Sequence, residues 1–321
     1  MPPSTNAPTP RPEASAPLVP ETRYAEANGL TIAYETFGAP DDPPMLMIMG
    51  LGTQMIAWSD ELCRSLADLG YYVIRYDNRD VGLSTHLDGV RVPGIADLVL
   101  RRKRPPYSLT DMAADAAGLL DALGIDSAHV VGASLGGFIA QTVAVEHPKR
   151  VRSLSLFMTS TGSRLVGRPK PSLLRRLARG GSSRGRAGAI EAAVETFTAI
   201  GSPGFPLDEE HLRDLAGRSY DRAHDVRGYQ RQLAVSITQP NRSKLLRNVR
   251  VPTVVIHGLA DPLVGADGGR AVARAIPGAK FVAIPGRGHD LPRALWPRFV
   301  EEISAVATEA DSTRRRESAD R

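Results

Sequence analysis

Near its middle the chain reads Val130-Val131-Gly132-Ala133-Ser134-Leu135-Gly136-Gly137-Phe138, the order of a buried strand, a sharp turn and a helix. The turn has the pattern Gly-x-Ser-x-Gly, in which the central residue is strained and projects its side chain out of a sheet. Such a turn needs small neighbours on both sides, and this stretch supplies them. Ser134 is therefore a candidate nucleophile. Because short runs of small residues also occur by chance, the remaining chain has to supply its partners.

Strands and helices alternate on both sides of this turn. Short apolar runs of four to eight residues are typical of strands covered on both faces, and helical patterns separate them. This order predicts βαβ units and fold class α/β, with a mostly parallel sheet of roughly eight strands and helices on both faces. The predicted strands cover residues 24–27, 31–37, 45–49, 72–76, 128–131, 151–158, 251–257 and 280–284.

The alternation stops after the sixth strand, where residues 160–250 contain helical patterns and no convincing strand. An insertion of this kind is typical of a helical cap over an active site. We expect a core made of residues 22–159 and 251–308. The Pro-, Ala-, Ser- and Thr-rich residues 1–21 are predicted to be disordered, and residues 309–321 to form a frayed tail.

Composition limits the class of protein. The chain has 321 residues and a single cysteine, so it contains no internal disulfide and no cysteine-rich metal cluster. Cys63 lies in a helical pattern, which favours a packed thiol over a nucleophile. No secretory signal and no apolar run long enough for a transmembrane segment are found, so we expect a cytoplasmic protein. No cofactor and no metal are predicted.

A serine hydroxyl needs a base and an acid that orients the base. Among seven histidines, His289 lies in a glycine-rich loop directly after the last predicted strand. Asp261 follows the preceding strand through a tight turn. Both positions are at the carboxyl ends of strands, where open parallel sheets bind ligands. The chain order Ser134, Asp261, His289 is the one expected for a serine on such a turn. His257 is interpreted as structural.

Two backbone N–H groups are predicted to form an oxyanion hole. One belongs to Leu135, at the start of the helix after the serine. The other belongs to Leu51, which Gly50 and Gly52 flank in the loop after the third strand. The alternative for these glycines is a simple tight turn. Three nearby apolar side chains are candidates for a substrate pocket, with core packing an equal alternative: Trp58, Met55 and Phe138.

These motifs, with the Arg79-centred loop over residues 75–84, resemble those of the α/β-hydrolase superfamily over about residues 24–307. Within it, Met49-Gly50-Leu51-Gly52 and the 75–84 loop resemble the esterase/lipase-like branch grouped with the aclacinomycin methylesterase. Two residues depart from the family pattern. Met49 stands where a histidine is common, and Asp80 stands where a glycine is usual. The 75–84 loop is interpreted as a structural brace below the site.

Eight basic residues and no acidic ones lie between Arg164 and Arg186. The segment contributes +8, whereas the whole chain carries only +5. One hypothesis is contact with an anionic surface or substrate near the active site, and the alternative is a solvated cap loop. Aromatic residues are scarce here, so a nucleic-acid partner is not expected.

The prediction that follows is a serine hydrolase that cleaves carboxylic esters or thioesters of small molecules or lipids through an acyl-enzyme. The same three residues also suit a carbon–carbon bond hydrolase or a cofactor-free perhydrolase, because fold and triad do not separate these reactions. A ligand-binding member without catalysis is a third alternative from another class.

Overall fold

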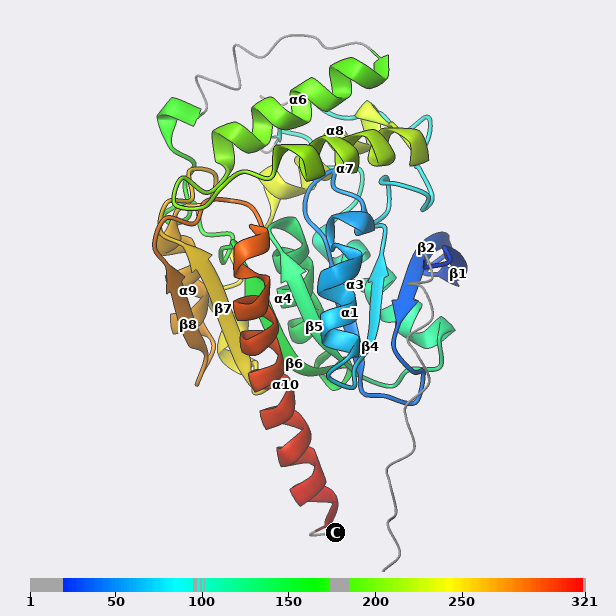
Figure 1. Cartoon of the computed structure of the whole chain (residues 1–321), viewed down its shortest axis with the longest axis vertical. Helices are drawn as coiled ribbons and strands as arrows, with labels where there is room; N and C mark the ends of the chain where they lie inside the picture. Colours follow the sequence, from blue (N-terminus) through cyan, green and yellow to red (C-terminus); the bar gives the residue numbers. More distant parts are fainter. Residues whose placement is uncertain (1–19, 95–96, 99, 101, 174–184, 320–321) are drawn as a thin grey trace, which may run out of the picture.

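The computed structural model describes residues 20–94, 97–98, 100, 102–173 and 185–319 (Figure 1). Within this part of the chain, the strands form one eight-stranded sheet in the order β1-β2-β4-β3-β5-β6-β7-β8. The β1–β2 and β2–β4 pairs are antiparallel, and all other pairs are parallel. The predicted fold class is confirmed. The strands are β1 (Arg23–Ala27), β2 (Leu30–Phe37), β3 (Pro44–Ile48), β4 (Tyr72–Tyr76), β5 (Ala128–Ala133), β6 (Val151–Phe157), β7 (Thr253–Gly258) and β8 (Lys280–Ile284).

The first two strands form a hairpin. Ala27 pairs with Leu30, which leaves a two-residue turn of Asn28 and Gly29. Their φ angles are 50° and 74°, so both adopt the left-handed conformation that this turn requires. Asn and Gly are the residues that adopt it at the lowest cost, which is why the turn was visible in the sequence.

Helices cover both faces of the sheet and create two apolar cores (Figure 1). Helices α3, α4 and α9 pack on one face, and α1 and α10 pack on the other. The central strand β3 is buried along its whole length, as its continuous apolar sequence predicts. The helices of the core are α1 (Asp60–Ala67), α3 (Leu109–Ala122), α4 (Leu135–Glu146), α9 (Ala266–Ala275) and α10 (Trp296–Ala319).

Helices α6 (Gly185–Ile200), α7 (Glu209–Arg222) and α8 (Val226–Thr238) lie between β6 and β7 in the chain. Figure 1 shows them stacked over the carboxyl ends of the strands. They correspond to three of the predicted cap helices. Residues 174–184 of the predicted cap and residues 1–19 of the predicted N-terminal tail lie outside the described residues.

The C-terminal helix is longer than the sequence suggests. We predicted an end near residue 307 and a frayed tail over 309–321, but α10 continues to Ala319. Ala310 is buried, and the carboxylate of Asp311 lies 3.4 Å from His129 at the base of the sheet. The segment has no apolar periodicity, but its Ala, Glu and Arg residues favour a helix, and these contacts hold the helix against the sheet. Within the described part of the chain, no helix is long and apolar enough to cross a membrane.

Candidate active site

Ser134 lies on the turn between β5 and α4, with φ 56° and ψ −116°. This left-handed backbone is costly for a residue with a side chain, and it persists because the surroundings leave no alternative. A Cβ added to Gly132 would lie 2.4 Å from the carbonyl oxygen of Gly136. A Cβ added to Gly136 would lie 2.1 Å from the carbonyl oxygen of Ile48. The two glycines therefore allow the turn to fit against its own helix and against β3.

The structure brings Ser134, Asp261 and His289 into one hydrogen-bonded line. His289 Nε2 lies 3.0 Å from the hydroxyl oxygen of Ser134, and His289 Nδ1 lies 2.7 Å from Oδ2 of Asp261. Because the carboxylate can only accept, Nδ1 carries the proton and Nε2 is free to accept the serine proton. Asp261 and His289 are buried, whereas Ser134 is partly exposed. This arrangement can generate a serine nucleophile.

The carboxylate of Asp261 is held in its charged form. Its Oδ1 accepts hydrogen bonds of 2.8 Å from the N–H groups of both Leu263 and Val264. Burial by itself would raise the pKa of Asp261. The charge of His289 outweighs burial and lowers this pKa, and hydrogen bonds from His257, His289 and the Val264 N–H add to the lowering. His257 Nε2 also donates to the Val264 carbonyl, so its role is structural, as predicted.

The two predicted oxyanion donors belong to the residue after the serine and to the loop after β3. Leu135 is the first residue of α4, and its N–H has no acceptor within that helix. In the other loop, Gly50 lies beside the serine, since a Cβ added to it would lie 3.7 Å from the Ser134 hydroxyl oxygen. Leu51 follows it. The next N–H, of Gly52, donates to Oε1 of Gln232 at 2.8 Å and is therefore not available to bind an oxyanion.

A cavity of about 440 Å³ lies between the cap and the loops above β3 and β4. The predicted pocket residues do not line it. Trp58 and Met55 are fully buried in the core, and Phe138 is buried with its ring against the guanidinium of Arg242. Trp58 lies before α1, because Ser59 is the N-cap of that helix. The Trp58 ring packs on the ring of Phe157. The walls come largely from the cap, which sequence reasoning could not position: they include Ala189, Ala193, Phe197, Leu212, Tyr220 and Tyr229.

The loop after β4 is a brace, as predicted. Asp77 accepts from the N–H groups of Met55 and Leu83, and Asn78 donates to the carbonyl of Met49. Arg79 forms a buried ion pair with Asp115 of α3. The loop thus ties the segment after β3 to the helix layer.

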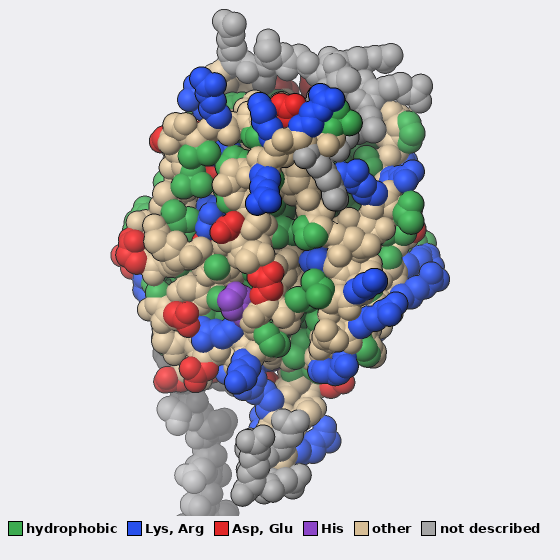
Figure 2. Space-filling view, turned by 180° about the vertical axis from the view of Figure 1, so that it is seen from behind, with side chains coloured by type: hydrophobic (Ala, Val, Ile, Leu, Met, Phe, Trp, Pro, Cys, Tyr) green, Lys and Arg blue, Asp and Glu red, His purple; other side chains and the backbone are tan. Residues whose placement is uncertain are grey.

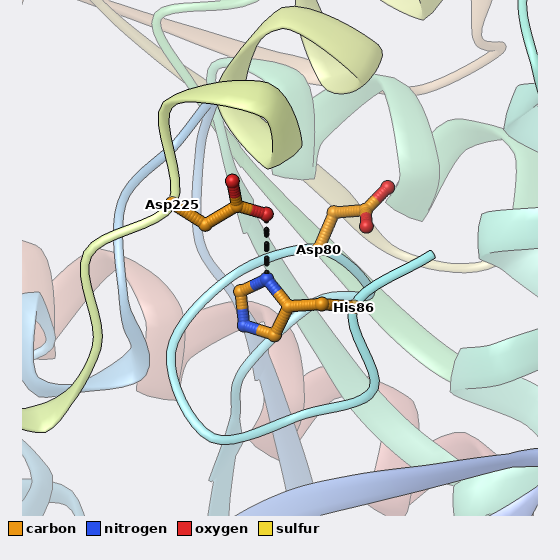
Figure 3. A group of neighbouring side chains, drawn as sticks. All are labelled: Asp80, His86 and Asp225. Atoms are coloured by element: carbon orange, nitrogen blue, oxygen red, sulfur yellow. Dashed lines mark hydrogen bonds and ion pairs between the residues drawn. The ribbon is translucent and has the colours of Figure 1, made fainter. Parts of the chain in front are cut away.

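Asp80, His86 and Asp225 approach one another at the polar end of the cavity (Figure 3). These three side chains resemble a cation site, but the guanidinium of Arg231 already neutralises the negative charge of the carboxylates. Arg231 donates to both carboxylate oxygens of Asp80, at 2.8 and 2.9 Å, and to Asp225 at 3.1 Å. The arrangement is therefore an ion-pair cluster that joins the cap to the core.

Two other sequence features are placed by the structure. Cys63 is buried, and burial raises the pKa of its thiol to about 12, which fits a packed side chain. Of the basic segment, Arg186 forms a bidentate ion pair with Asp221. Figure 2 shows Lys and Arg side chains interspersed with acidic ones over the face seen from behind. Half of the basic segment lies outside the described residues: Arg175, Arg176, Arg179 and Arg184.

A family model for the alpha/beta hydrolase fold matches residues 43–292. The chain belongs to this family. Rhodomycin D methylesterase DauP from Streptomyces sp. (strain C5) is 31% identical over 306 residues, which covers 88% of this chain and 97% of that protein. A putative non-heme bromoperoxidase, BpoC, from Mycobacterium tuberculosis is 28% identical over 81% of this chain and 91% of its own length. Among solved structures, the meta-cleavage product hydrolase from Pseudomonas fluorescens IP01 has a TM-score of 0.68 at 20% identity, covering 90% of this chain and 98% of that one.

This α/β-hydrolase is an ester hydrolase by class, and the predicted resemblance is confirmed. Sequence reasoning missed two contacts of the cap with the site. His289 N–H donates to the carbonyl of Ile200, and Gln232 accepts the Gly52 N–H. No local pattern reveals either contact, because both join positions far apart in the chain.

Proposed function

We propose that Ser134 is the nucleophile of a carboxylic ester hydrolase, with His289 as its base and Asp261 as the acid that orients the base. The observation that carries this proposal is the unbroken pair of hydrogen bonds, 3.0 and 2.7 Å long, that joins the three side chains. The geometry meets the distance requirement for proton transfer in the resting enzyme. Membership of the family makes serine-dependent hydrolysis the chemistry it supports best.

The reaction proceeds in two halves. The Ser134 oxygen attacks the carbonyl carbon while its proton moves to Nε2 of His289. His289 then returns this proton to the departing alcohol oxygen as the carbon–oxygen bond breaks, leaving an acyl-enzyme. Water attacks the acyl carbon, giving its proton to His289, and the serine leaves with that proton as the acid is released.

Each attack places a negative charge on the carbonyl oxygen. The N–H groups of Leu135 and Leu51 would receive this charge, and the positive end of the α4 dipole adds to the effect at Leu135. The closeness of Gly50 to the serine hydroxyl supports this assignment for the Leu51 loop. Removing one such donor costs roughly 10²- to 10³-fold in kcat in other enzymes.

The substrate we propose is a small-molecule carboxylic ester with a small alcohol group, such as a methyl ester. A 31% identical relative is a methylesterase. The cavity beneath the cap has largely apolar walls and reaches the oxyanion loop at Gly52, while Ser134 and His289 do not line it. We place the rest of the acid in this cavity. Its volume lies within the range of small-molecule sites. Arg186 of the basic segment pairs with Asp221. A lipid ester substrate and a contact of the basic segment with anionic surfaces stay predictions from the sequence.

The test compares Ser134→Ala with the wild type on a panel of methyl and p-nitrophenyl esters. We expect at least a roughly 10³-fold loss of kcat, since the acyl-enzyme cannot form. A fluorophosphonate should add to the Ser134 peptide in mass spectrometry and should fail to add in the variant. The matched control is Ser65→Ala, at an exposed position of α1, which should keep full activity. Undiminished turnover by Ser134→Ala would refute the proposal.

Carbon–carbon bond hydrolysis and perhydrolysis are the alternatives, and relatives with such names are similar to this chain. They would use the same three residues. Halide oxidation in peroxide and acetate without any ester turnover would favour a perhydrolase. Turnover of a vinylogous diketone in place of esters would favour a carbon–carbon hydrolase. A ligand-binding member would bind esters without cleaving them.

A further inference from the structure

Helix α8 of the cap carries two consecutive polar side chains that are fully buried, Arg231 and Gln232. Both reach into the core loops instead of solvent. Buried polar groups are mostly hydrogen-bonded, so the partners show what this helix does. Gln232 bonds the loops after β3 and β4. Arg231 bonds Asp80 of the loop after β4 and Asp225 at the N-terminus of α8, while its Nη1 has no hydrogen-bond partner among the described residues.

Gln232 joins these two loops directly. Its Oε1 accepts the N–H of Gly52 at 2.8 Å, and its Nε2 donates to the carbonyl of Arg79 at 2.8 Å. Since one partner is a donor and the other an acceptor, only one orientation of the amide satisfies both. A hydrocarbon of the same shape would satisfy neither.

The bond at Gly52 bears on the oxyanion donor. Fixing the Gly52 N–H fixes the peptide plane between Leu51 and Gly52, which is adjacent to the plane that carries the Leu51 N–H. Gly52 has φ 62°, a conformation that the free loop would exchange for others. The loop is also closed by the bond from the Thr53 N–H to the Gly50 carbonyl, at 3.3 Å. The Leu51 N–H then has little freedom to change its direction.

A buried ion pair sets the register of α8 on the core. Arg231 and Asp80 are both buried, and the guanidinium binds both carboxylate oxygens. Asp80 has φ 67°, the left-handed conformation that accounts for the glycine usual at this position in the family. A Cβ on Gly228 would lie 2.1 Å from the Asp80 carbonyl oxygen, so the helix lies directly against this loop. A shift of α8 would strand two buried charges, which is strongly unfavourable.

We propose that Gln232 is a positioning residue that holds the Leu51 N–H of the oxyanion hole, so that the cap contributes to transition-state stabilisation as well as covering the site. The inference rests on the proposed function. Asp80 and Arg231 act one step further away, because they hold α8 where Gln232 can reach Gly52.

The test is Gln232→Met, which keeps the side-chain length and removes both hydrogen bonds. Misplacing one donor should lower kcat for a short p-nitrophenyl ester by about 10- to 100-fold, with KM changed less than about twofold. A trifluoromethyl ketone, which forms an oxyanion on Ser134, should lose affinity by the same factor as kcat/KM. An uncharged ether analogue of the substrate should bind as before. Gln230→Met, on the exposed side of the same helix, is the matched control and should behave as the wild type.

Unchanged kcat and unchanged ketone affinity in a folded Gln232→Met variant would overturn the inference, as would an equal loss of affinity for the ketone and the ether. If this variant does not fold, Gln232→Glu replaces it. A protonated glutamate can accept from Gly52 and donate to the Arg79 carbonyl, whereas an ionised one cannot donate. Its kcat relative to the wild type should therefore rise as pH falls, and a constant ratio would overturn the inference. Activity that survives in Ser134→Ala would overturn the proposed function as well.

Discussion

At the scale of single residues, the site depends on the state of one carboxylate. Asp261 receives two backbone N–H groups on one oxygen and the His289 ring on the other. These bonds lower its pKa against the effect of burial. A depressed pKa means that the stabilisation is present above the ordinary carboxyl pKa of about 4 and is lost only as pH falls through the lower folded-state value. Asp261 therefore stays charged throughout the range in which the proposed base works.

Asp261→Asn should reduce kcat by about 10³- to 10⁴-fold. An amide at this position can present its N–H₂ group to His289, which favours the tautomer with the proton on Nε2 and leaves the serine without a base. KM should change little. Steady-state kinetics on a p-nitrophenyl ester measure the effect, and Asp267→Asn, at an exposed position of α9, serves as the control. Wild-type kcat in Asp261→Asn would contradict the proposed role.

At the scale of elements, the cap is attached to the core by specific bonds and not by apolar packing alone. Besides α8, the loop after α6 contacts the histidine loop. Ser202 accepts the N–H of Gly288 at 2.8 Å and binds the carboxylate of Asp290, and Ile200 accepts the N–H of His289. Cap segments therefore touch both the base loop and the oxyanion loop. A change in the cap should consequently alter turnover as well as substrate choice.

The link between His86 and Asp225 should make the attachment of the cap depend on pH. His86 Nε2 faces the Gly82 carbonyl at 2.9 Å and Nδ1 faces Asp225 at 2.8 Å, so both bonds require the charged ring. Burial would lower the pKa of His86, but these bonds and the charges of Asp225 and Asp80 raise it despite the nearby Arg231. The stabilisation is thus complete below the ordinary histidine pKa of about 6.5 and is lost as pH rises through the folded-state value.

His86→Gln should therefore lower Tm most near pH 6 and progressively less toward pH 9. Differential scanning fluorimetry at several pH values measures this difference. His224→Gln changes an exposed cap histidine and should give a small effect that does not depend on pH in this way. A Tm difference between wild type and His86→Gln that grows with pH would have the wrong sign.

At the scale of the whole molecule, the last helix closes the base of the sheet. Helix α10 packs along one face and then continues beyond it, where Asp311 reaches His129 on β5 and Arg152 on β6. Burial raises the pKa of Asp311, but its contact with His129 and the charges of Arg152 and Arg315 outweigh burial and lower this pKa. Residues at the far end of the chain thus stabilise the strand that carries the serine.

Truncation after Thr308 should destabilise the protein by about 1–3 kcal/mol, because it removes the buried Ala310 and the partner of His129. Urea unfolding followed by circular dichroism measures this change. Truncation after Arg316 keeps these contacts and should leave stability within about 0.5 kcal/mol of the full chain. Equal stability of the two truncated proteins would show that the extended end of α10 contributes nothing.

The sequence by itself determined the architecture and the three residues of the proposed catalytic triad, Ser134, Asp261 and His289. Alternating apolar strands, the Asn28-Gly29 turn and the small residues around Ser134 are local signals, because backbone conformation and burial of a continuous strand depend on near neighbours. Asp261 and His289 could be selected because the carboxyl ends of parallel strands meet at one edge of the sheet. A residue that directly follows such a strand therefore lies near the site.

Only the tertiary structure decided which residues surround this triad. Trp58 and Met55 proved to be fully buried before the start of α1, with the Trp58 ring packed on Phe157. The cavity walls come from cap helices whose packing has no local signature. Asp80 was visible in the sequence only as a departure from a pattern, and its partner Arg231 lies 151 residues away. Gln232 gave no signal at all. Its role follows from two hydrogen bonds across loops that folding brings together, and pairings of that kind are decided by three-dimensional packing and not by sequence neighbours.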